Sequence, residues 1–187
     1  MLTRQEKEKL LNQRAKVIWF TGLSGAGKST IAEALELKLY RDHYKTQMLD
    51  GDIIRNGINK NLGFSIEDRY ENIRRISEVS KLLLSGGIIC LNTFISPTKE
   101  IRDIAREIIG NDSYLEIFVA TPLEVCEKRD VKGLYKAARA GAIKNFTGIT
   151  SPYESPDHPD LIVKTTNRNI EETVQEVYEF ILPKIKF

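Results

Sequence analysis

Short apolar runs alternate with longer stretches of mixed apolar and polar residues along most of this chain. Apolar side chains recur at helical spacing in the longer stretches, which predicts a helix up to about Tyr40 and others over 67–84, 98–109 and 170–184. The short runs are rich in β-branched and aromatic residues, and they predict strands at 17–21, 45–50, 88–92, 115–119 and 160–163. Continuously apolar strands between helices indicate an α/β fold with a parallel sheet covered on both faces.

Composition narrows the class of protein without naming a partner. The 187 residues are 41% hydrophobic and 29% charged with a net charge of +2, which excludes a fibrous or disordered chain and predicts no nucleic-acid partner from bulk charge. No apolar run approaches the ~18 residues of a membrane span. Cys90 and Cys126 lie in apolar segments and are expected to be buried free thiols, so we expect one cytoplasmic domain over 1–187 with no membrane contact.

A glycine-rich segment directly after the first predicted strand carries the strongest chemical signal. Gly22-Leu23-Ser24-Gly25-Ala26-Gly27-Lys28-Ser29 matches G-x-x-x-x-G-K-[ST] at every fixed position and opens the next helix, where Thr30 follows. Such a loop surrounds phosphates with backbone amides, while Lys28 reaches the β- and γ-phosphates and the Ser29 hydroxyl binds Mg²⁺. We therefore expect ATP and Mg²⁺ to bind here.

An acidic pair follows the second predicted strand. Asp50 and Asp52 are two residues apart, so both carboxylates face one site if the chain is still extended there. We interpret them as groups that orient an acceptor hydroxyl and hold Mg²⁺-bound water, and one of them takes the proton late in transfer. A solvated Asp-Gly turn is the alternative. No N/T-K-x-D element typical of guanine recognition is present.

A basic segment in the second half of the chain resembles a lid. Residues 128–146 carry six Lys or Arg side chains and a single acid, Asp130, with Gly133 and Gly141 as candidate joints. A mobile cationic lid, which we place at about 128–150, excludes water and stabilises the transferring phosphoryl group. A solvated helix face and a nucleic-acid patch are the alternatives.

Several strings together resemble the adenylylsulfate kinase (APS kinase) family. They are GLSGAGKST (22–30), LDGD with Arg55 (49–55), NLGFS (61–65), EDRYENIRR (67–75), FISP (94–97), PLEVCEKRDVKGLYKAARAGAIKNFTGI (122–149) and SPYE (151–154). The resemblance implies a three-layer P-loop kinase fold with a five-stranded parallel sheet and a lid. It also implies transfer of the ATP γ-phosphate to the 3′-hydroxyl of adenosine 5′-phosphosulfate, which yields 3′-phosphoadenosine 5′-phosphosulfate and ADP in sulfate assimilation.

The resemblance also assigns residues to the acceptor. Phe64 and Phe146 match the aromatic clamp of the adenine, although composition alone favours core phenylalanines. Arg55, Arg69 and Asn72 match the groups that hold the phosphosulfate and ribose, where the guanidinium fork suits oxyanions. The remaining candidates are Arg129, as a lid residue near ATP, and Asp52, Ile95, Ser96, Lys132 and Lys144 on the acceptor side.

Ser96 matches a serine described in the family as a phosphoserine intermediate. Nothing adjacent in sequence activates it, so we list it as a catalytic candidate but favour a lining role. Thr98, Lys99 and Thr150 depart from the common family pattern on the acceptor side. Two alternatives therefore stay open, a kinase of this scaffold with another nucleotide-like acceptor and a nucleotide-binding regulator without turnover.

The expected partners are few. We expect a homodimer, and the predicted helix within residues 1–14 is one candidate contact with a second subunit. Functional coupling to an ATP sulfurylase is the other association that the reaction suggests.

Overall fold

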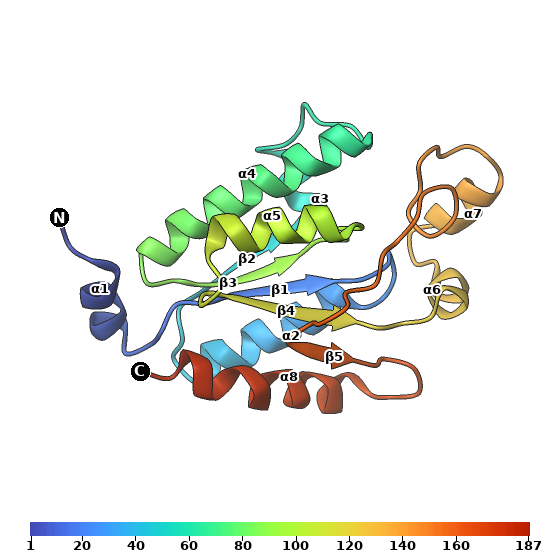
Figure 1. Ribbon diagram of the computed structural model, residues 1–187. Coiled ribbons are helices and arrows are strands. Elements are labelled where there is room, and N and C mark those ends of the chain that lie inside the picture. The colour runs from blue at the N-terminus through green and yellow to red at the C-terminus, as the bar shows by residue number, and fades with distance from the viewer.

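Parallel strands form the central sheet of the computed structural model, which describes residues 1–187 (Figure 1). The strand order is β2-β3-β1-β4-β5, and every neighbouring pair is parallel. The strands are β1 (Val17–Thr21), β2 (Thr46–Asp50), β3 (Ile89–Thr93), β4 (Tyr114–Val119) and β5 (Leu161–Val163). The α/β class and all five predicted strands are confirmed, with ends that differ by at most one residue.

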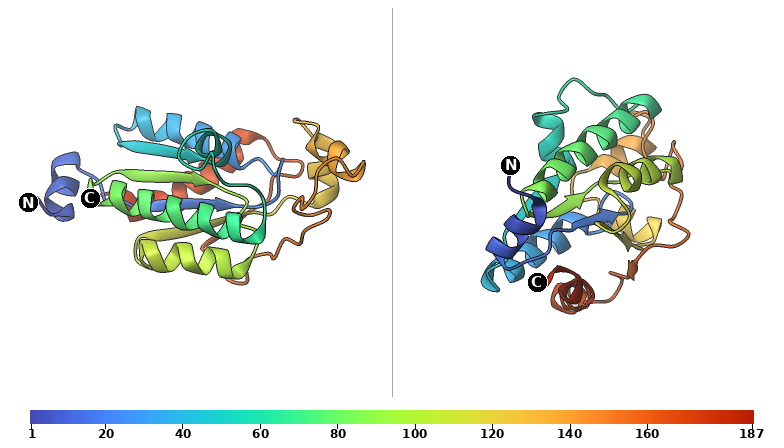
Figure 2. Two further views of the ribbon diagram at one scale, coloured as in Figure 1. Left: turned by 90° about the horizontal axis from the view of Figure 1, so that it is seen from above. Right: turned by 60° about the vertical axis from the view of Figure 1, so that its left-hand side comes forward.

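Helices cover both faces of the sheet and give three layers (Figures 1 and 2). They are α1 (Arg4–Leu11), α2 (Lys28–Arg41), α3 (Gly51–Asn56), α4 (Ile66–Ser85), α5 (Lys99–Ile109), α6 (Leu123–Arg129), α7 (Leu134–Arg139) and α8 (Ile170–Ile185). α2 and α8 share one apolar cluster with the sheet, whereas α4 and α5 pack into the other, which contains Trp19. No helix is both long enough and apolar enough to span a membrane.

Two local features were not anticipated from the sequence. The chain leaves β2 directly into α3, a helix that begins at Gly51 and is capped by the Asp50 side chain. The predicted lid begins in the last two residues of α6 and contains the whole of α7, and the residues between these two helices end at Gly133, whose φ is 67°. Both departures occur where short helices lack enough turns to show a clear periodicity.

Helix α1 lies at the end of the sheet opposite the glycine-rich loop (Figure 1). It is held by its own chain, because Arg4 donates hydrogen bonds to Ser113 Oγ and to the carbonyl of Ala15. Gln13, two residues after the end of α1, is fully buried and donates to the carbonyls of Lys45 and Gly87. The helical prediction for residues 1–14 is confirmed, and their contact with a second subunit stays a prediction.

Candidate active site

The glycine-rich loop lies between β1 and α2, as expected. Gly22 has a φ of 147°, and a Cβ there would come within 2.7 Å of the Val119 carbonyl oxygen, so only glycine fits. Lys28 is buried and its Nζ donates to the carbonyls of Gly22 (2.9 Å) and Leu23 (2.8 Å). Burial lowers the pKa of Lys28 to about 8. The Lys28 ammonium group, at the start of α2, is therefore held by two backbone carbonyls of the glycine-rich loop.

The hydroxyl of Ser29 is joined directly to the acid that ends β2. Ser29 Oγ and Thr93 Oγ1 each donate to Asp50 Oδ2 at 2.6 Å, and the Asp52 amide donates to Asp50 Oδ1 at 2.9 Å. Burial raises the pKa of Asp50, but the hydrogen bonds from these groups lower that pKa by more, so that the net shift is downward. An ionised carboxylate and a hydroxyl thus meet beside the glycine-rich loop, where both are oxygen donors of the kind that Mg²⁺ prefers.

Asp52 lies apart from this pair in its surroundings. Because α3 begins at Gly51, the extended chain that would turn Asp50 and Asp52 to the same side does not exist, and that part of the prediction is wrong. The Asp52 side chain is 70% exposed and forms an ion pair with Lys132 of the lid. Asp52 therefore faces the lid, while Asp50 faces Ser29.

Arg55 and Arg69 gather around Phe64 between α3 and α4. The guanidinium carbon of Arg55 lies 4.3 Å from the centroid of the Phe64 ring, and that of Arg69 lies 5.7 Å away. The Phe64 ring is nevertheless 57% exposed. Asn72 is buried one turn after Arg69, where its Oδ1 accepts a hydrogen bond from Asn59 at 2.9 Å. The predicted acceptor residues of this region are thus neighbours, with an aromatic face open to solvent.

The lid meets this cluster through Arg69. Arg69 Nη2 donates to the backbone carbonyl of Asn145 at 2.7 Å, which brings the residue before Phe146 next to the start of α4. Phe146 is partly buried and packs edge-on against Tyr135, with 5.0 Å between ring centroids. Neither Phe64 nor Phe146 is a fully buried core residue.

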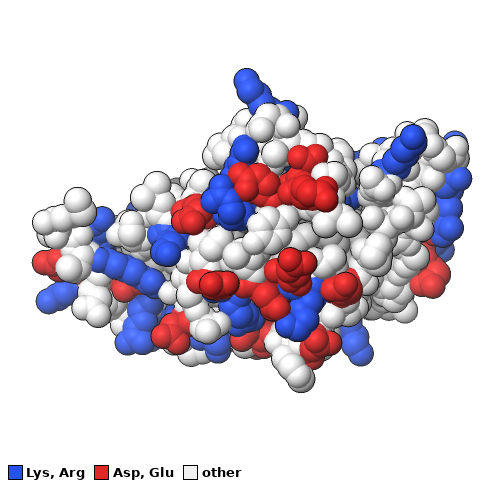
Figure 3. Space-filling view, turned by 45° about the horizontal axis from the view of Figure 1, so that its top comes forward, with Lys and Arg blue, Asp and Glu red and all other residues white.

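The basic side chains of the lid are not equivalent. Arg129 donates to the carbonyls of Gly25 and Ala26 and to Thr165, so it lies against the glycine-rich loop. Arg139 is paired with Glu127, an acid just outside the counted basic segment, and Lys144 is exposed. The space-filling view shows blue side chains at the lid end of the molecule, on its right (Figure 3).

Ser96 is placed differently from a nucleophile. It is 2% exposed, and its Oγ accepts from Trp19 Nε1 at 3.1 Å and donates to Thr21 Oγ1 at 3.0 Å. A hydroxyl already engaged in two buried hydrogen bonds, with no base among its partners, is not poised to accept a phosphoryl group. The geometry therefore opposes the listing of Ser96 as catalytic.

Sequence reasoning missed three polar groups that contact functional segments. Tyr135 Oη donates to the carbonyl of Ser24 in the glycine-rich loop at 2.9 Å. Thr165 receives Arg129, and Thr121 Oγ1 donates to the Ala26 carbonyl at 2.9 Å. Only Tyr135 belongs to a quoted motif, so the other two had no local signal.

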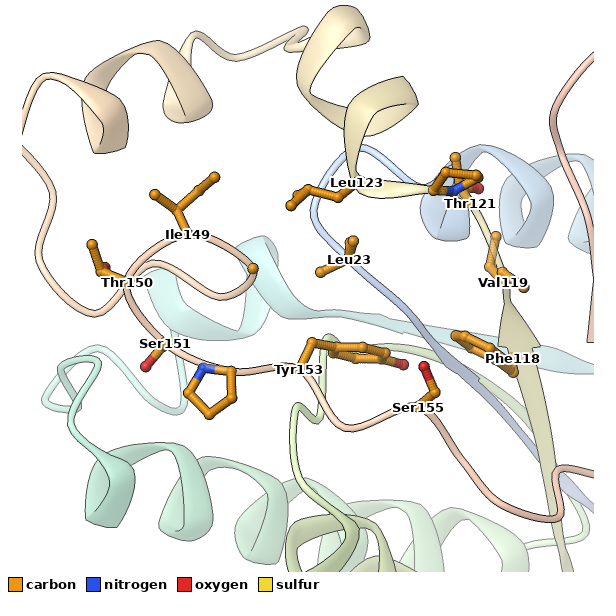
Figure 4. Close-up of a pocket in the computed structure, with 14 residues that line it drawn as sticks. Leu23, Phe118, Val119, Thr121, Leu123, Ile149, Thr150, Ser151, Tyr153 and Ser155 are labelled. Carbon is orange, nitrogen blue, oxygen red and sulfur yellow. The ribbon is translucent and has the colours of Figure 1, made fainter.

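A hollow of about 780 Å³ opens beside the glycine-rich loop (Figure 4). It lies between the end of β4, the start of α6 and the strand-free segment around residues 148–155. Leu23, Leu123, Ile149 and Tyr153 project into it, and no charged side chain lines it. Leu23 is its sole member among the predicted site residues, so this hollow adjoins the candidate active site but is not that site.

The two cysteines and the two histidines take no part in this site. Cys90 and Cys126 are buried free thiols, as predicted, while His43 and His158 are exposed. No cluster of three or more His, Cys, Asp or Glu side chains is arranged to hold a metal ion. Any divalent cation bound here would thus depend on few protein ligands, as Mg²⁺ in nucleotide sites does.

Comparison with known proteins points in the same direction as the site. Residues 14–164 match the family described as adenylylsulphate kinase. The adenylyl-sulfate kinase of Bacteroides thetaiotaomicron is 59% identical over 186 residues, which cover 100% of this chain and 92% of that protein.

Solved structures of APS kinases also resemble this fold. The APS kinase CysC of Mycobacterium tuberculosis, solved in complex with AMPPNP and APS, superposes with a TM-score of 0.87 at 48% identity and covers 90% of this chain and 98% of its own. A hexameric APS kinase from Thiobacillus denitrificans gives a TM-score of 0.70 at 30% identity, over 92% of this chain and 30% of that one.

Proposed function

This chain belongs to the adenylylsulphate kinase family and transfers the γ-phosphate of ATP to the ribose 3′-hydroxyl of adenosine 5′-phosphosulfate (APS), and we propose how its residues divide that work. The products are ADP and 3′-phosphoadenosine 5′-phosphosulfate. The observation that carries the proposal is that α3 connects two groups of residues. Asp50, which accepts from Ser29 of the glycine-rich loop, caps the start of α3, and Arg55, which lies over the Phe64 ring, is in the same helix.

The donor half of the site comprises the glycine-rich loop and the residues that contact it. The loop residues Gly22, Leu23, Ser24, Gly25, Ala26, Gly27, Lys28, Ser29 and Thr30 hold the triphosphate of ATP through backbone amides and the N-terminus of α2. Lys28 leaves the carbonyls of Gly22 and Leu23 for the phosphates, which are stronger acceptors for an ammonium. Arg129 lies over the loop beside Thr165, in a position suited to the base or phosphates of ATP.

Mg²⁺ fits the oxygen donors next to this loop. Ser29 supplies a hydroxyl ligand, and Asp50, with a pKa held low by hydrogen bonds, supplies an ionised carboxylate for the metal or its water. When bound, Mg²⁺ neutralises charge that develops on the β- and γ-phosphates. The protein keeps the Asp50 carboxylate next to Ser29, because the Thr93 hydroxyl donates to the same carboxylate oxygen as Ser29 does.

The acceptor half binds the adenine and the oxyanions of APS. Phe64 offers an exposed ring for stacking, and Phe146 approaches from the lid side, where Arg69 joins the two segments. The guanidinium groups of Arg55 and Arg69 turn from the Phe64 ring to bind the phosphosulfate. Asn72 binds the ribose. Lys132 and Lys144 of the lid supply further positive charge, and the backbone at Ile95 lines the acceptor.

The phosphoryl group passes directly from donor to acceptor. Direct in-line transfer requires positioning and charge stabilisation, and it needs no covalent intermediate on the protein. The buried hydrogen bonds of Ser96 Oγ agree with this route. Asp52 faces the lid and orients the 3′-hydroxyl, and it takes the proton of that hydroxyl late in transfer. Lys132, which is paired with Asp52, is close enough to stabilise the charge on the transferring phosphoryl group.

A coupled assay of ADP release tests the proposal. Purified protein is mixed with ATP, Mg²⁺ and a panel of nucleotide acceptors, and product is identified by mass. Turnover with APS alone supports the proposal, and its loss on chelation of Mg²⁺ supports the metal site. Turnover with another nucleotide but not with APS favours a different acceptor. Nucleotide binding without turnover would indicate a regulatory protein and refute the proposal.

The associations remain part of the proposal as well. We keep a homodimer as the expected assembly, which multi-angle light scattering of the purified protein measures directly. Coupling to an ATP sulfurylase, which makes APS, and a cytoplasmic location follow from the reaction. The test is the rate at which the two enzymes together form product from sulfate and ATP. A rate above the one calculated from the kinetics of each enzyme assayed alone would support such coupling.

A further inference from the structure

The segment 94–97, here named the acceptor loop, is held by three different parts of the molecule. The Ile95 carbonyl accepts a hydrogen bond from Thr21 Oγ1 in β1 at 2.7 Å. The next carbonyl, of Ser96, accepts from Arg102 Nη1 in α5 at 3.0 Å, and that of Pro97 accepts from the Glu154 amide at 2.8 Å. Three consecutive carbonyls therefore have three separate donors, which fixes the path of the loop at each residue.

The backbone of the acceptor loop is strained at Ser96. Its φ of 40° lies in the left-handed region, which costs a residue with a Cβ about 1 kcal/mol or more. Trp19 Nε1 and Thr21 Oγ1 hold the serine side chain in that conformation. Such strain persists only where the surroundings over-determine it, and the Arg102 bond to the Ser96 carbonyl is the one contact in this set made by a charged group.

Arg102 occupies an unusually buried position for a charged residue. The side chains of Arg102 and Glu116 are 5% and 8% exposed, and Arg102 Nε lies 3.3 Å from Glu116 Oε1. That carboxylate oxygen nevertheless has no hydrogen-bond partner, whereas the Arg102 bond to the Ser96 carbonyl is well formed. The guanidinium is thus aimed at the acceptor loop in preference to its own counter-ion.

A buried ion pair gives little net stability compared with apolar side chains of similar size. Arg106 and Asp160 complete a cluster of four charges around Glu116, and neither makes a hydrogen bond with the acceptor loop. Fold stability alone therefore does not account for a buried guanidinium directed at a loop carbonyl. Placement of that loop does.

We propose that Arg102 is a positioning residue for the acceptor, which holds the strained acceptor loop where it meets APS, and that Glu116 serves to keep the Arg102 side chain in place. This inference rests on the proposed function, in which the backbone at Ile95 lines the acceptor site. Arg102 touches neither reacting group. Its loss therefore weakens the binding of APS and leaves the ATP half of the site unchanged.

The decisive variant removes both buried charges together. Arg102→Met with Glu116→Leu leaves no unpaired charge, so the domain folds, yet the Ser96 carbonyl has lost its donor. We expect KM for APS to rise about tenfold or more, with KM for ATP within twofold of wild type. A second variant, Arg102→Lys, keeps a positive charge opposite Glu116 but offers one ammonium in place of the fork. Its ammonium is drawn to the carboxylate, and we expect KM for APS to rise at least threefold.

Two matched variants separate positioning from a merely structural role. Arg106→Met lies one turn along α5 and alters the same charge cluster without a hydrogen bond to the acceptor loop, so its KM for APS stays within twofold of wild type. Glu116→Gln keeps an acceptor for Arg102 and changes KM for APS little. Melting temperatures and circular dichroism identify any variant that does not fold.

The outcomes are distinct. A wild-type KM for APS in either folded Arg102 variant overturns the positioning role, as does an equal rise of KM for ATP. An effect of Arg106→Met as large as that of Arg102→Lys also overturns it, because the cluster as a whole would then be responsible. If the wild-type protein does not phosphorylate APS at all, the proposed function fails first, and the two failures are therefore not confused.

Discussion

Truncation of Phe64 to alanine tests the acceptor half of the site with little disturbance of the fold. The ring is 57% exposed, and its recorded partners are the guanidinium groups of Arg55 and Arg69. Each exposed cation–π contact is worth roughly 0.5–1 kcal/mol. Phe64→Ala should therefore lower the free energy of unfolding by no more than about 2 kcal/mol, and circular dichroism should be unchanged.

The expected effect on APS is much larger than the effect on the fold. Stacking of a base on an aromatic ring contributes about 1–3 kcal/mol. Since each 1.4 kcal/mol is a factor of ten, KM for APS should rise between about fivefold and 150-fold in Phe64→Ala. KM for ATP should stay the same. Phe146 is a poorer probe, because it also packs against Tyr135 in the lid, so its loss mixes adenine contacts with lid stability.

Initial rates of ADP release, measured against APS and ATP separately, give both constants. Phe64→Tyr keeps the ring and should remain near wild type. Ile66→Ala is the matched control, because Ile66 lies two residues away and is 72% exposed, so it removes a comparable apolar surface outside the proposed stack. A folded Phe64→Ala variant whose KM for APS lies within twofold of wild type would refute the adenine clamp.

Four further tests address the donor loop and the buried thiols. Burial holds the pKa of Lys28 at about 8, and bound phosphates raise it. ATP binding at pH 8.5 should therefore take up a proton, and the affinity for ATP should weaken as the pH rises from about 8 to 10. Equal calorimetric heats of binding in two buffers of different ionisation enthalpy would contradict this. Lys28→Ala should cut kcat at least about 100-fold in a folded protein, and near-normal turnover would exclude its role. Gly22→Ala places a Cβ against the Val119 carbonyl and should destabilise the fold by about 2 kcal/mol or more in urea titrations, whereas an unchanged midpoint would show that the loop adapts. Burial raises the pKa of Cys90 to about 12 and that of Cys126 above its usual value, so Ellman's reagent should label both thiols only after unfolding, and prompt labelling of the native protein would mean that the thiols are accessible.

Much of the donor half was predictable from local sequence. The glycine-rich loop is a contiguous string whose function depends on its own backbone, and its place between a strand and a helix follows from the adjacent periodicities. The five strands were found for the same reason, since each is a short apolar run whose neighbours along the chain define its ends.

The acceptor half and the acid pair depended on contacts that the linear pattern does not encode. Whether Asp50 and Asp52 share a side depended on one residue, Gly51, where the chain turns into α3 and is no longer extended. Ser96 was a candidate nucleophile until its hydroxyl was found between Trp19 and Thr21, which are contributed by β1. In both cases the residue type was right and its surroundings decided the role.

By itself, the amino-acid sequence determined the α/β class, the phosphate-binding loop and the family, because these depend on residues that are close along the chain. Tertiary structure alone decided the strand order β2-β3-β1-β4-β5, the pairing of Ser29 with Asp50, and the direction in which Arg102 points from beside Glu116. Hydrogen bonds and buried charges are short-ranged and directional, so their partners are set only when the sheet has brought distant segments within about 3 Å of each other.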